Sequence, residues 1–326
     1  MCGIAGFIND GLLDTRKGEL AHVFAKLMME TSARGTDATG AWVQNRNVWF
    51  LKGAYTATEM VRQTAYEKLM VKVNHTTTAV VGHCRAATKG MPADNRNNHP
   101  VQAGPIVLVH NGIISNSEEI VKEWTDAPTV DTAAAAYAIW QESKTVTTAG
   151  SIAKALERLK GWFSLAITDL RNPSVVYIVR HLAPMYFAYD EARKVMWFAS
   201  DDVHIKKATG LTKTDAIKED VIYCFRPGTP TMQLPVPKLT NRYTQEYTRY
   251  PQQGWMANRA GNNQVQESEV ELNERLQRIH DEYYSGRYGA PAGMKYVDGK
   301  LVPNEDRLYV PPTSSVQQLI EGMPCD

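Results

Sequence analysis

Cys2 carries the first side chain that could perform chemistry. Removal of Met1 would give this residue a free α-amine beside its thiol. A thiol is a strong nucleophile once it is deprotonated, and an α-amine with a pKa of about 8 can take that proton near neutral pH. Nucleophile and base would then share one residue. The alternative at this position is a small cysteine packed in a core.

Further along the chain, short motifs combine glycine with histidine, asparagine, arginine and aspartate. They are CGIAG (2–6), RGTDATG (34–40), GHCRAATKG (82–90), NHP (98–100), HNGIISN (110–116) and DT (131–132). In this order they resemble the motifs of class II glutamine amidotransferases, the glutaminase domains with an N-terminal cysteine nucleophile. The resemblance is greatest to the glutaminase parts of glucosamine-6-phosphate synthase and of glutamine phosphoribosylpyrophosphate amidotransferase. It covers residues 2 to about 230.

The resemblance implies a reaction. Cys2 attacks the side-chain amide of L-glutamine, ammonia leaves, and a thioester on the cysteine is hydrolysed to glutamate. The tetrahedral intermediate carries an oxyanion, which preorganised hydrogen-bond donors stabilise. By resemblance these donors are the side-chain amide of Asn111 and the backbone N–H of Gly112. Taken alone, an Asn-Gly pair after a strand is more often a turn.

Glutamine must also be distinguished from other amides by its α-carboxylate and its α-ammonium group. A guanidinium can pair both oxygens of a carboxylate, and a carboxylate pairs with an ammonium group. The resemblance assigns these two contacts to Arg85 and Asp131, with Thr88 in support. Arg34 and Gly35 are expected to shape the loop around the terminal amine, and a purely structural role is the alternative for both.

The chain departs from the family pattern around the expected ligand site. Ala86 stands where the family often has Trp, and Lys89 stands where a His often follows the threonine. Val130 and Ala133 replace a Ser and a Glu of the pattern. These changes bear on loop closure and on glutamine affinity more than on the reaction.

Hydrophobic patterning predicts the elements that must position these residues. β-branched and apolar runs predict strands over residues 3–8, 41–43, 48–51, 78–82, 106–109, 163–169, 175–180, 185–189, 195–199 and 221–225. Apolar residues at helical spacing predict helices around 20–28 and over 58–73, 117–124, 132–142 and 151–159. Strands at both ends with helices between them indicate an α+β fold. The resemblance implies a four-layer αββα sandwich, with two antiparallel sheets between helices.

The composition changes after Phe225, where four prolines mark an extended exit. We therefore expect a class II glutamine amidotransferase domain over residues 2–240 and an extended, partly helical tail over residues 241–326. A single apolar stripe predicts one helix in the tail, over about 266–284. The tail has too few apolar residues for a core of its own, so it is expected to lie on the main domain or on a partner.

Charge and cysteine spacing exclude several function classes. The 326 residues contain 36 Lys+Arg and 35 Asp+Glu, so no strong basic field favours nucleic acid or an anionic membrane. The four cysteines show no metal-ligand or disulfide spacing. The sequence therefore predicts a cytoplasmic protein with no metal, no other cofactor, no nucleic acid and no membrane partner. Cys84 and Cys224 are expected to be inert core residues.

Three functions stay open at this point. The first is a glutaminase that delivers ammonia to a separate synthase, because the residues after 230 are too few for an ammonia-using domain. The second is an N-terminal-cysteine hydrolase of another amide, against which the pair Arg85 and Asp131 argues. The third is a regulatory or assembly module without catalysis, which retention of Met1 would favour.

Overall fold

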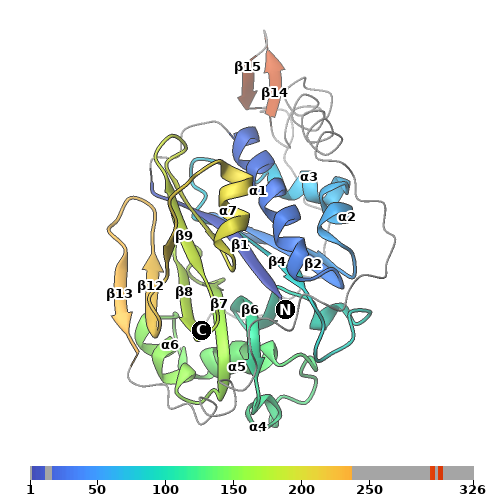
Figure 1. Cartoon of the computed structure of the whole chain (residues 1–326), viewed down its shortest axis with the longest axis vertical. Helices are drawn as coiled ribbons and strands as arrows, with labels where there is room; N and C mark the ends of the chain where they lie inside the picture. The colour runs from blue at the N-terminus through green and yellow to red at the C-terminus, as the bar shows by residue number, and fades with distance from the viewer. Residues whose placement is uncertain (1, 12–16, 237–293, 298–299, 304–326) are drawn as a thin grey trace. The chain divides into compact units, whose positions relative to one another are not determined.

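The computed structural model describes residues 2–11, 17–236, 294–297 and 300–303 (Figure 1). Contacts between Cα atoms divide the chain into two units, Met1–Glu267 and Ser268–Asp326. In the second unit, β14 (Met294–Val297) and β15 (Lys300–Pro303) form an antiparallel hairpin. The helix expected over 266–284 lies outside the described residues, and the domain boundary after residue 240 stays a prediction.

Two antiparallel sheets form the centre of the first unit. The larger sheet has the strand order β11-β9-β10-β1-β4-β2-β3 and the smaller one β13-β12-β8-β7-β6-β5. The larger sheet contains β1 (Gly3–Asn9), β2 (Ala38–Gln44), β3 (Val48–Gly53), β4 (Ala79–Arg85), β9 (Tyr186–Asp190), β10 (Val195–Ala199) and β11 (Asp215–Ala216). The smaller sheet contains β5 (Val101–Ala103), β6 (Ile106–Ile114), β7 (Gly161–Asp169), β8 (Val176–His181), β12 (Val221–Phe225) and β13 (Met232–Pro235). The predicted strands are present, and several extend further than their apolar runs.

One apolar core joins the facing sides of the two sheets. Ile4, Trp42 and Val81 of the larger sheet pack with Val107 and Val109 of the smaller sheet, and all five side chains are fully buried. Because helices cover the outer faces too, these strands are buried on both sides and read as continuous apolar runs. The core therefore holds β1 and β6, which carry the CGIAG and HNGIISN motifs, in facing sheets.

Helices cover the outer face of each sheet (Figure 1). The helices packed on the larger sheet are α1 (Lys17–Thr31), α2 (Ala57–Val61), α3 (Thr64–Met70) and α7 (Asp202–Thr209). The smaller sheet is covered by α5 (Thr132–Glu142) and α6 (Ala149–Leu156), with α4 (Ser117–Val121) against α5. There are also two short 3₁₀ helices among the described residues. Ser32–Arg34 directly follows α1, and Asn95–Asn97 precedes β5. The expected α+β four-layer sandwich is confirmed.

Two helices differ from the sequence expectation. The single helix expected over 58–73 is two helices, because Gln63 adopts an extended conformation and the chain starts a new turn there. Met60 and Tyr66, one from each helix, are both buried, although they would lie on different faces of one continuous helix. Helix α7 was not expected. Its signals are Asp201, which caps the N-terminus, and Gly210, which ends the helix in a left-handed conformation.

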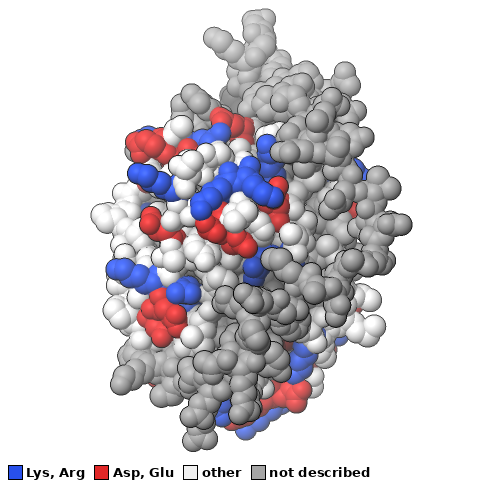
Figure 2. Space-filling view, viewed as in Figure 1, with Lys and Arg blue, Asp and Glu red and all other residues white. Residues whose placement is uncertain are grey.

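The surface fits the near-zero net charge. On the face shown in Figure 2, positive and negative side chains are interspersed among uncharged ones. Within the described residues, no helix is long and apolar enough to cross a lipid bilayer.

Candidate active site

Cys2 lies directly before β1, beside the point where β4 ends. Its Sγ donates a hydrogen bond to the carbonyl oxygen of Ala86 at 3.4 Å. Burial raises the pKa of the Cys2 thiol. The thiol is therefore protonated at rest near neutral pH, and a reaction through sulfur needs a base beside it.

Arg34 and Gly35 lie directly behind Cys2. The Nε of Arg34 donates to the backbone carbonyl of Cys2 at 2.9 Å, which fixes the backbone of the nucleophile. A Cβ on Gly35 would come within 2.4 Å of the Ala86 backbone nitrogen, so a side chain at 35 would push away the peptide that contacts the thiol. Asp37 adds a third tie, because its carboxylate accepts the Ala87 N–H at 2.7 Å. The sequence reasoning did not single out Asp37.

A small cavity brings most of the expected site residues together. It is lined by Cys2, Arg85, Ala86, Thr88, Lys89, His99, His110, Gly112, Val130, Asp131 and Thr132. Its free volume is about 10 Å³, which is space for about one water molecule. Cys2, Arg85, Thr88, Gly112 and Asp131 were all expected at the ligand site. Asn111 is not among the lining residues.

Arg85 is held by its own loop. The side chain is fully buried, and its guanidinium donates to Asn98 Oδ1 at 2.9 Å. It also donates to the carbonyl oxygens of Lys89 and Gly90, each at 2.6 Å. These bonds use three of the five guanidinium N–H groups. Lys52 supports the same segment by donating to the Asn98 carbonyl at 2.9 Å, and burial lowers the pKa of this lysine to about 8.

Asp131 presents one oxygen to the backbone and the other toward a buried histidine. Its Oδ2 accepts the N–H of Ile114 at 2.8 Å, and its Oδ1 lies 3.8 Å from Nδ1 of His110. The hydroxyl of Thr132 lies 3.1 Å from His110 Nδ1 and 2.8 Å from His99 Nε2. The carboxylate is thus oriented at the cavity wall by its neighbours.

Three buried histidines surround this wall, and the sequence reasoning gave them no role. The rings of His83 and His99 stack with centroids 3.8 Å apart, and His83 Nε2 lies 2.9 Å from the carbonyl oxygen of His110. Burial lowers the pKa of His83 to about 3 and also lowers the pKa values of His99 and His110. All three are therefore neutral at pH 7. Each of the three histidines belongs to one of the sequence motifs, and this membership could have indicated a place near the site.

The Asn111-Gly112 pair lies within β6 rather than in a turn. Gly112 has a φ of 144°, and a Cβ there would approach the Trp162 carbonyl oxygen to 2.0 Å, so a side chain cannot be accommodated. Asn111 is fully buried, and its Nδ2 donates to the hydroxyl of Ser200 at 3.3 Å. Among the described residues its Oδ1 has no hydrogen-bond partner.

Cys84 and Cys224, the other cysteines among the described residues, are not part of the cavity lining. Cys84 is fully buried in β4, and burial raises the pKa of its thiol. Cys224 is half-buried in β12, so it is less enclosed than expected for a core residue. In the described part of the chain, one group has metal-ligand proximity: His181, Glu219 and Asp220. Asp220 already accepts a hydrogen bond from the histidine ring at 2.6 Å, and Glu219 lies 3.4 Å from Arg180.

Comparison with known proteins bears on the family. A family model described as a glutamine amidotransferase domain matches residues 83–207. A glutamine–fructose-6-phosphate aminotransferase (isomerizing) of Thermococcus kodakarensis is 34% identical over 212 residues, which are 62% of this chain and 32% of that protein. Its counterpart from Pyrobaculum aerophilum is 29% identical over 209 residues, 62% of this chain and 33% of that protein. The chain thus spans about one third of the length of the curated relatives that it matches.

Solved structures agree on the fold. The glutamine phosphoribosylpyrophosphate amidotransferase of B. subtilis aligns with a TM-score of 0.55 and 17% identity, over 72% of this chain and 49% of that one. At that identity the similarity concerns the fold. Taken with the sequence similarities, it supports a class II glutamine amidotransferase domain with the N-terminal-nucleophile hydrolase fold in this chain.

Proposed function

We propose that this protein hydrolyses the side-chain amide of L-glutamine at Cys2 and passes the ammonia to a separate synthase. The observation that carries the proposal is the cavity that Cys2 shares with Arg85, Thr88, Gly112 and Asp131. A nucleophile, a cation, an anion and a backbone N–H at one wall are the groups that a glutamine amide, carboxylate and ammonium group require.

The first half of the proposed reaction forms a thioester. After removal of Met1, the α-amine of Cys2 takes the thiol proton, and Sγ attacks the amide carbon of glutamine. The Gly112 N–H and the Asn111 side-chain amide donate to the oxyanion. The α-amine then returns its proton to the leaving nitrogen, and ammonia departs. The raised pKa of the Cys2 thiol makes this internal base necessary near neutral pH.

The second half of the reaction releases glutamate. The same α-amine takes a proton from a water molecule, which attacks the thioester carbon and forms a second oxyanion. Collapse of that intermediate breaks the C–S bond, and the proton returns to sulfur. Throughout, the proposed contacts are Arg85 with the α-carboxylate and Asp131 with the α-ammonium group. Thr88 supports the same ligand.

Binding of glutamine requires the loop over residues 86–90 to open. A free volume of about 10 Å³ cannot hold an amino acid. To pair the ligand carboxylate through Nη2, the guanidinium of Arg85 exchanges its bonds to Lys89 and Gly90 for bonds to the ligand. We infer that the closed loop is the resting state, and that it closes again over bound glutamine and excludes water.

The experiment begins with the mature N-terminus. Mass spectrometry of the protein purified from cells is expected to show a chain that starts at Cys2. Glutamate release from glutamine is expected from the wild type and is expected to vanish in Cys2→Ala. Cys224→Ala is the matched control, because this half-buried cysteine lies outside the cavity lining, and it should keep the activity.

Two results would contradict the proposal. A mature chain that retains Met1 has no free amine on the nucleophile and favours a regulatory module. Hydrolysis of apolar acyl amides in preference to glutamine favours an N-terminal-cysteine hydrolase of another substrate. The separate synthase is tested by adding candidate ammonia-accepting enzymes and measuring whether their product forms from glutamine without free ammonium.

A further inference from the structure

Ser200 links the strand that carries Cys2 to the strand that carries Asn111. It is fully buried at the end of β10, and its hydroxyl oxygen accepts the Ile4 N–H at 3.0 Å. Its own N–H donates to the Ile4 carbonyl at 2.9 Å. The same hydroxyl oxygen accepts a hydrogen bond from Nδ2 of Asn111 at 3.3 Å. The Ser200 side chain therefore bridges the two sheets. It contacts the larger sheet at Ile4, two residues after Cys2, and the smaller sheet at Asn111.

The next residue, Asp201, also connects this region to the nucleophile, through Arg34. Asp201 caps α7 and lies 3.9 Å from Nη1 of Arg34, whose Nε holds the carbonyl of Cys2. The junction between β10 and α7 thus contacts two groups beside the proposed reaction. Ser200 bonds the side-chain amide of Asn111, and Asp201 pairs with Arg34, which bonds the backbone of Cys2. None of the sequence motifs includes this junction.

We propose that Ser200 is a positioning residue for Asn111 in the oxyanion site. This inference rests on the proposed glutaminase reaction and deepens it. The Asn111 amide group carries two N–H bonds. Ser200 fixes one of them against the backbone of Ile4, so the amide is held at a set orientation before substrate arrives. Preorganised donors stabilise an oxyanion because they need no rearrangement during the reaction.

The experiment compares Ser200→Ala with Ser164→Ala. Ser164 is the matched control, because it is also fully buried and pairs with Asn111 in the β6–β7 register, but its hydroxyl donates to the carbonyl of Ala183. Two rates are measured for each variant: glutamine hydrolysis and alkylation of Cys2 by iodoacetamide. Alkylation consumes the thiolate but forms no oxyanion, so it reports whether the nucleophile itself is intact.

Ser200→Ala is expected to lower kcat by about 10- to 100-fold, somewhat less than loss of an oxyanion donor itself. KM and the alkylation rate are expected to stay within about threefold of wild type. In Asn111→Ala, which removes the amide, the added change Ser200→Ala is expected to have little further effect, because the two residues act as one unit. Ser164→Ala is expected to retain kcat.

The outcomes separate the two proposals. If the wild type hydrolyses glutamine but Ser200→Ala has the same kcat as Ser164→Ala, the positioning role is wrong and the glutaminase proposal stands. Parallel losses of kcat and alkylation would assign Ser200 a general structural role instead, as would full additivity with Asn111→Ala. A wild type with a free Cys2 amine and no glutaminase activity would overturn both.

Discussion

At the scale of single residues, Asp131 offers a direct test of substrate recognition. Asp131→Asn keeps the shape of the side chain and an acceptor for the Ile114 N–H, but it removes the negative charge. We expect KM for glutamine to rise about 10- to 100-fold, because a hydrogen bond to a charged group contributes about 1.5–3 kcal/mol. The change in kcat is expected to be smaller. Steady-state kinetics with glutamine measure both values.

A surface substitution controls for this change. Asp126→Asn alters a carboxylate that is 86% exposed, and KM is expected to match the wild type. An Asp131→Asn enzyme with unchanged KM would show that the α-ammonium group of glutamine is recognised elsewhere. A large loss of thermal stability without a change in KM would assign the carboxylate to the support of β6.

Residue types and their order predicted many of the residues that line the cavity, but few of the residues that hold those side chains in place. Cys2, Arg85 and Asp131 could be selected because their chemistry matches the groups of one ligand. Ser200 could not, since its partner Ile4 lies 196 positions away along the chain and the contact crosses from one strand to another. Similarly, Asn111 could be read as a turn residue until β6 was seen to continue through it.

At the scale of elements, two side-chain ties hold the loop over residues 86–90 in addition to its contacts with Cys2 and Arg85. Asp37 holds its start through the Ala87 N–H. Lys89 holds its end, because its Nζ donates to Glu118 at 2.8 Å and to the hydroxyl of Ser117 at 3.2 Å, at the start of α4.

Lys89→Met is expected to favour the open loop. An exposed ion pair stabilises the closed loop only weakly, so the open population should rise by no more than about fivefold. The alkylation rate of Cys2 without glutamine is expected to rise by the same factor, as measured by mass spectrometry over time. Lys122→Met, directly after α4, is the matched control and should leave the rate unchanged. Equal rates in Lys89→Met and wild type would show that this tie does not govern loop opening.

Periodicity predicted where elements lie better than where they break. The buried residues of α2 and those of α3 would fall on opposite faces of one continuous helix, so their spacing carries a sign of the break at Gln63 that the prediction of a single helix did not use. Helix α7 has few apolar residues but clear caps at Asp201 and Gly210. Its missed prediction shows that capping residues carry information where a weak apolar stripe does not.

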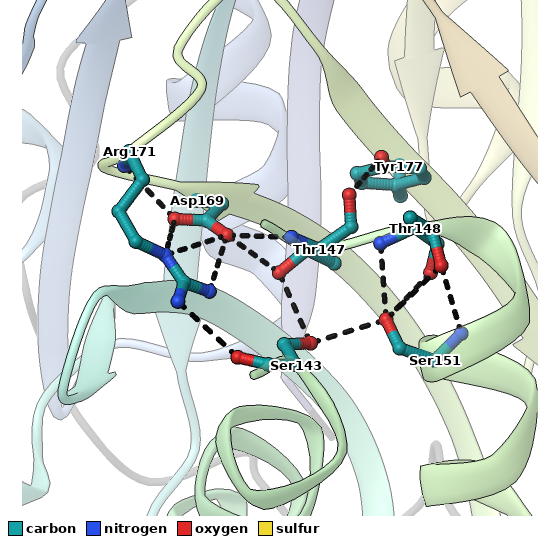
Figure 3. Close-up of polar contacts among 7 residues, drawn as sticks. All are labelled: Ser143, Thr147, Thr148, Ser151, Asp169, Arg171 and Tyr177. Carbon is teal, nitrogen blue, oxygen red and sulfur yellow. Dashed lines mark hydrogen bonds and ion pairs between the residues drawn. The ribbon is translucent and has the colours of Figure 1, made fainter. Parts of the chain in front are cut away.

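At the scale of the whole molecule, a buried polar network ties the smaller sheet to its helices (Figure 3). Asp169, at the end of β7, is fully buried and accepts from Thr147 N–H and Oγ1, each at 2.8 Å. Arg171 donates to the same carboxylate, at 2.7 Å through Nη2. Ser143 and Ser151 extend the network to the end of α5 and the start of α6, with their hydroxyls 3.1 Å apart. The network joins β7 to α5 and α6, and the sequence pattern did not predict these contacts.

Asp169→Asn is expected to destabilise the fold by about 1–3 kcal/mol, because the buried carboxylate accepts hydrogen bonds from Thr147 and from the partly exposed Arg171. Burial alone would raise the pKa of Asp169, but hydrogen bonds from Arg171 and Thr147 outweigh it and hold the pKa below its usual value. A carboxyl whose folded-state pKa is depressed stabilises the fold fully above its unfolded value of about 3.9. That contribution is lost as the pH falls through the folded-state pKa.

The difference in the free energy of unfolding between wild type and Asp169→Asn should therefore be constant from pH 7 to about 5 and shrink below about 4. Urea titrations at each pH measure it. Asp94→Asn is the matched control, because Asp94 also pairs with an arginine two residues later, Arg96, but at the exposed surface. Salt and water screen that pair, so its loss should leave the stability near that of the wild type. Equal effects of the two substitutions would mean that burial does not strengthen the Asp169 network, and that the smaller sheet and its helices are joined by apolar packing alone.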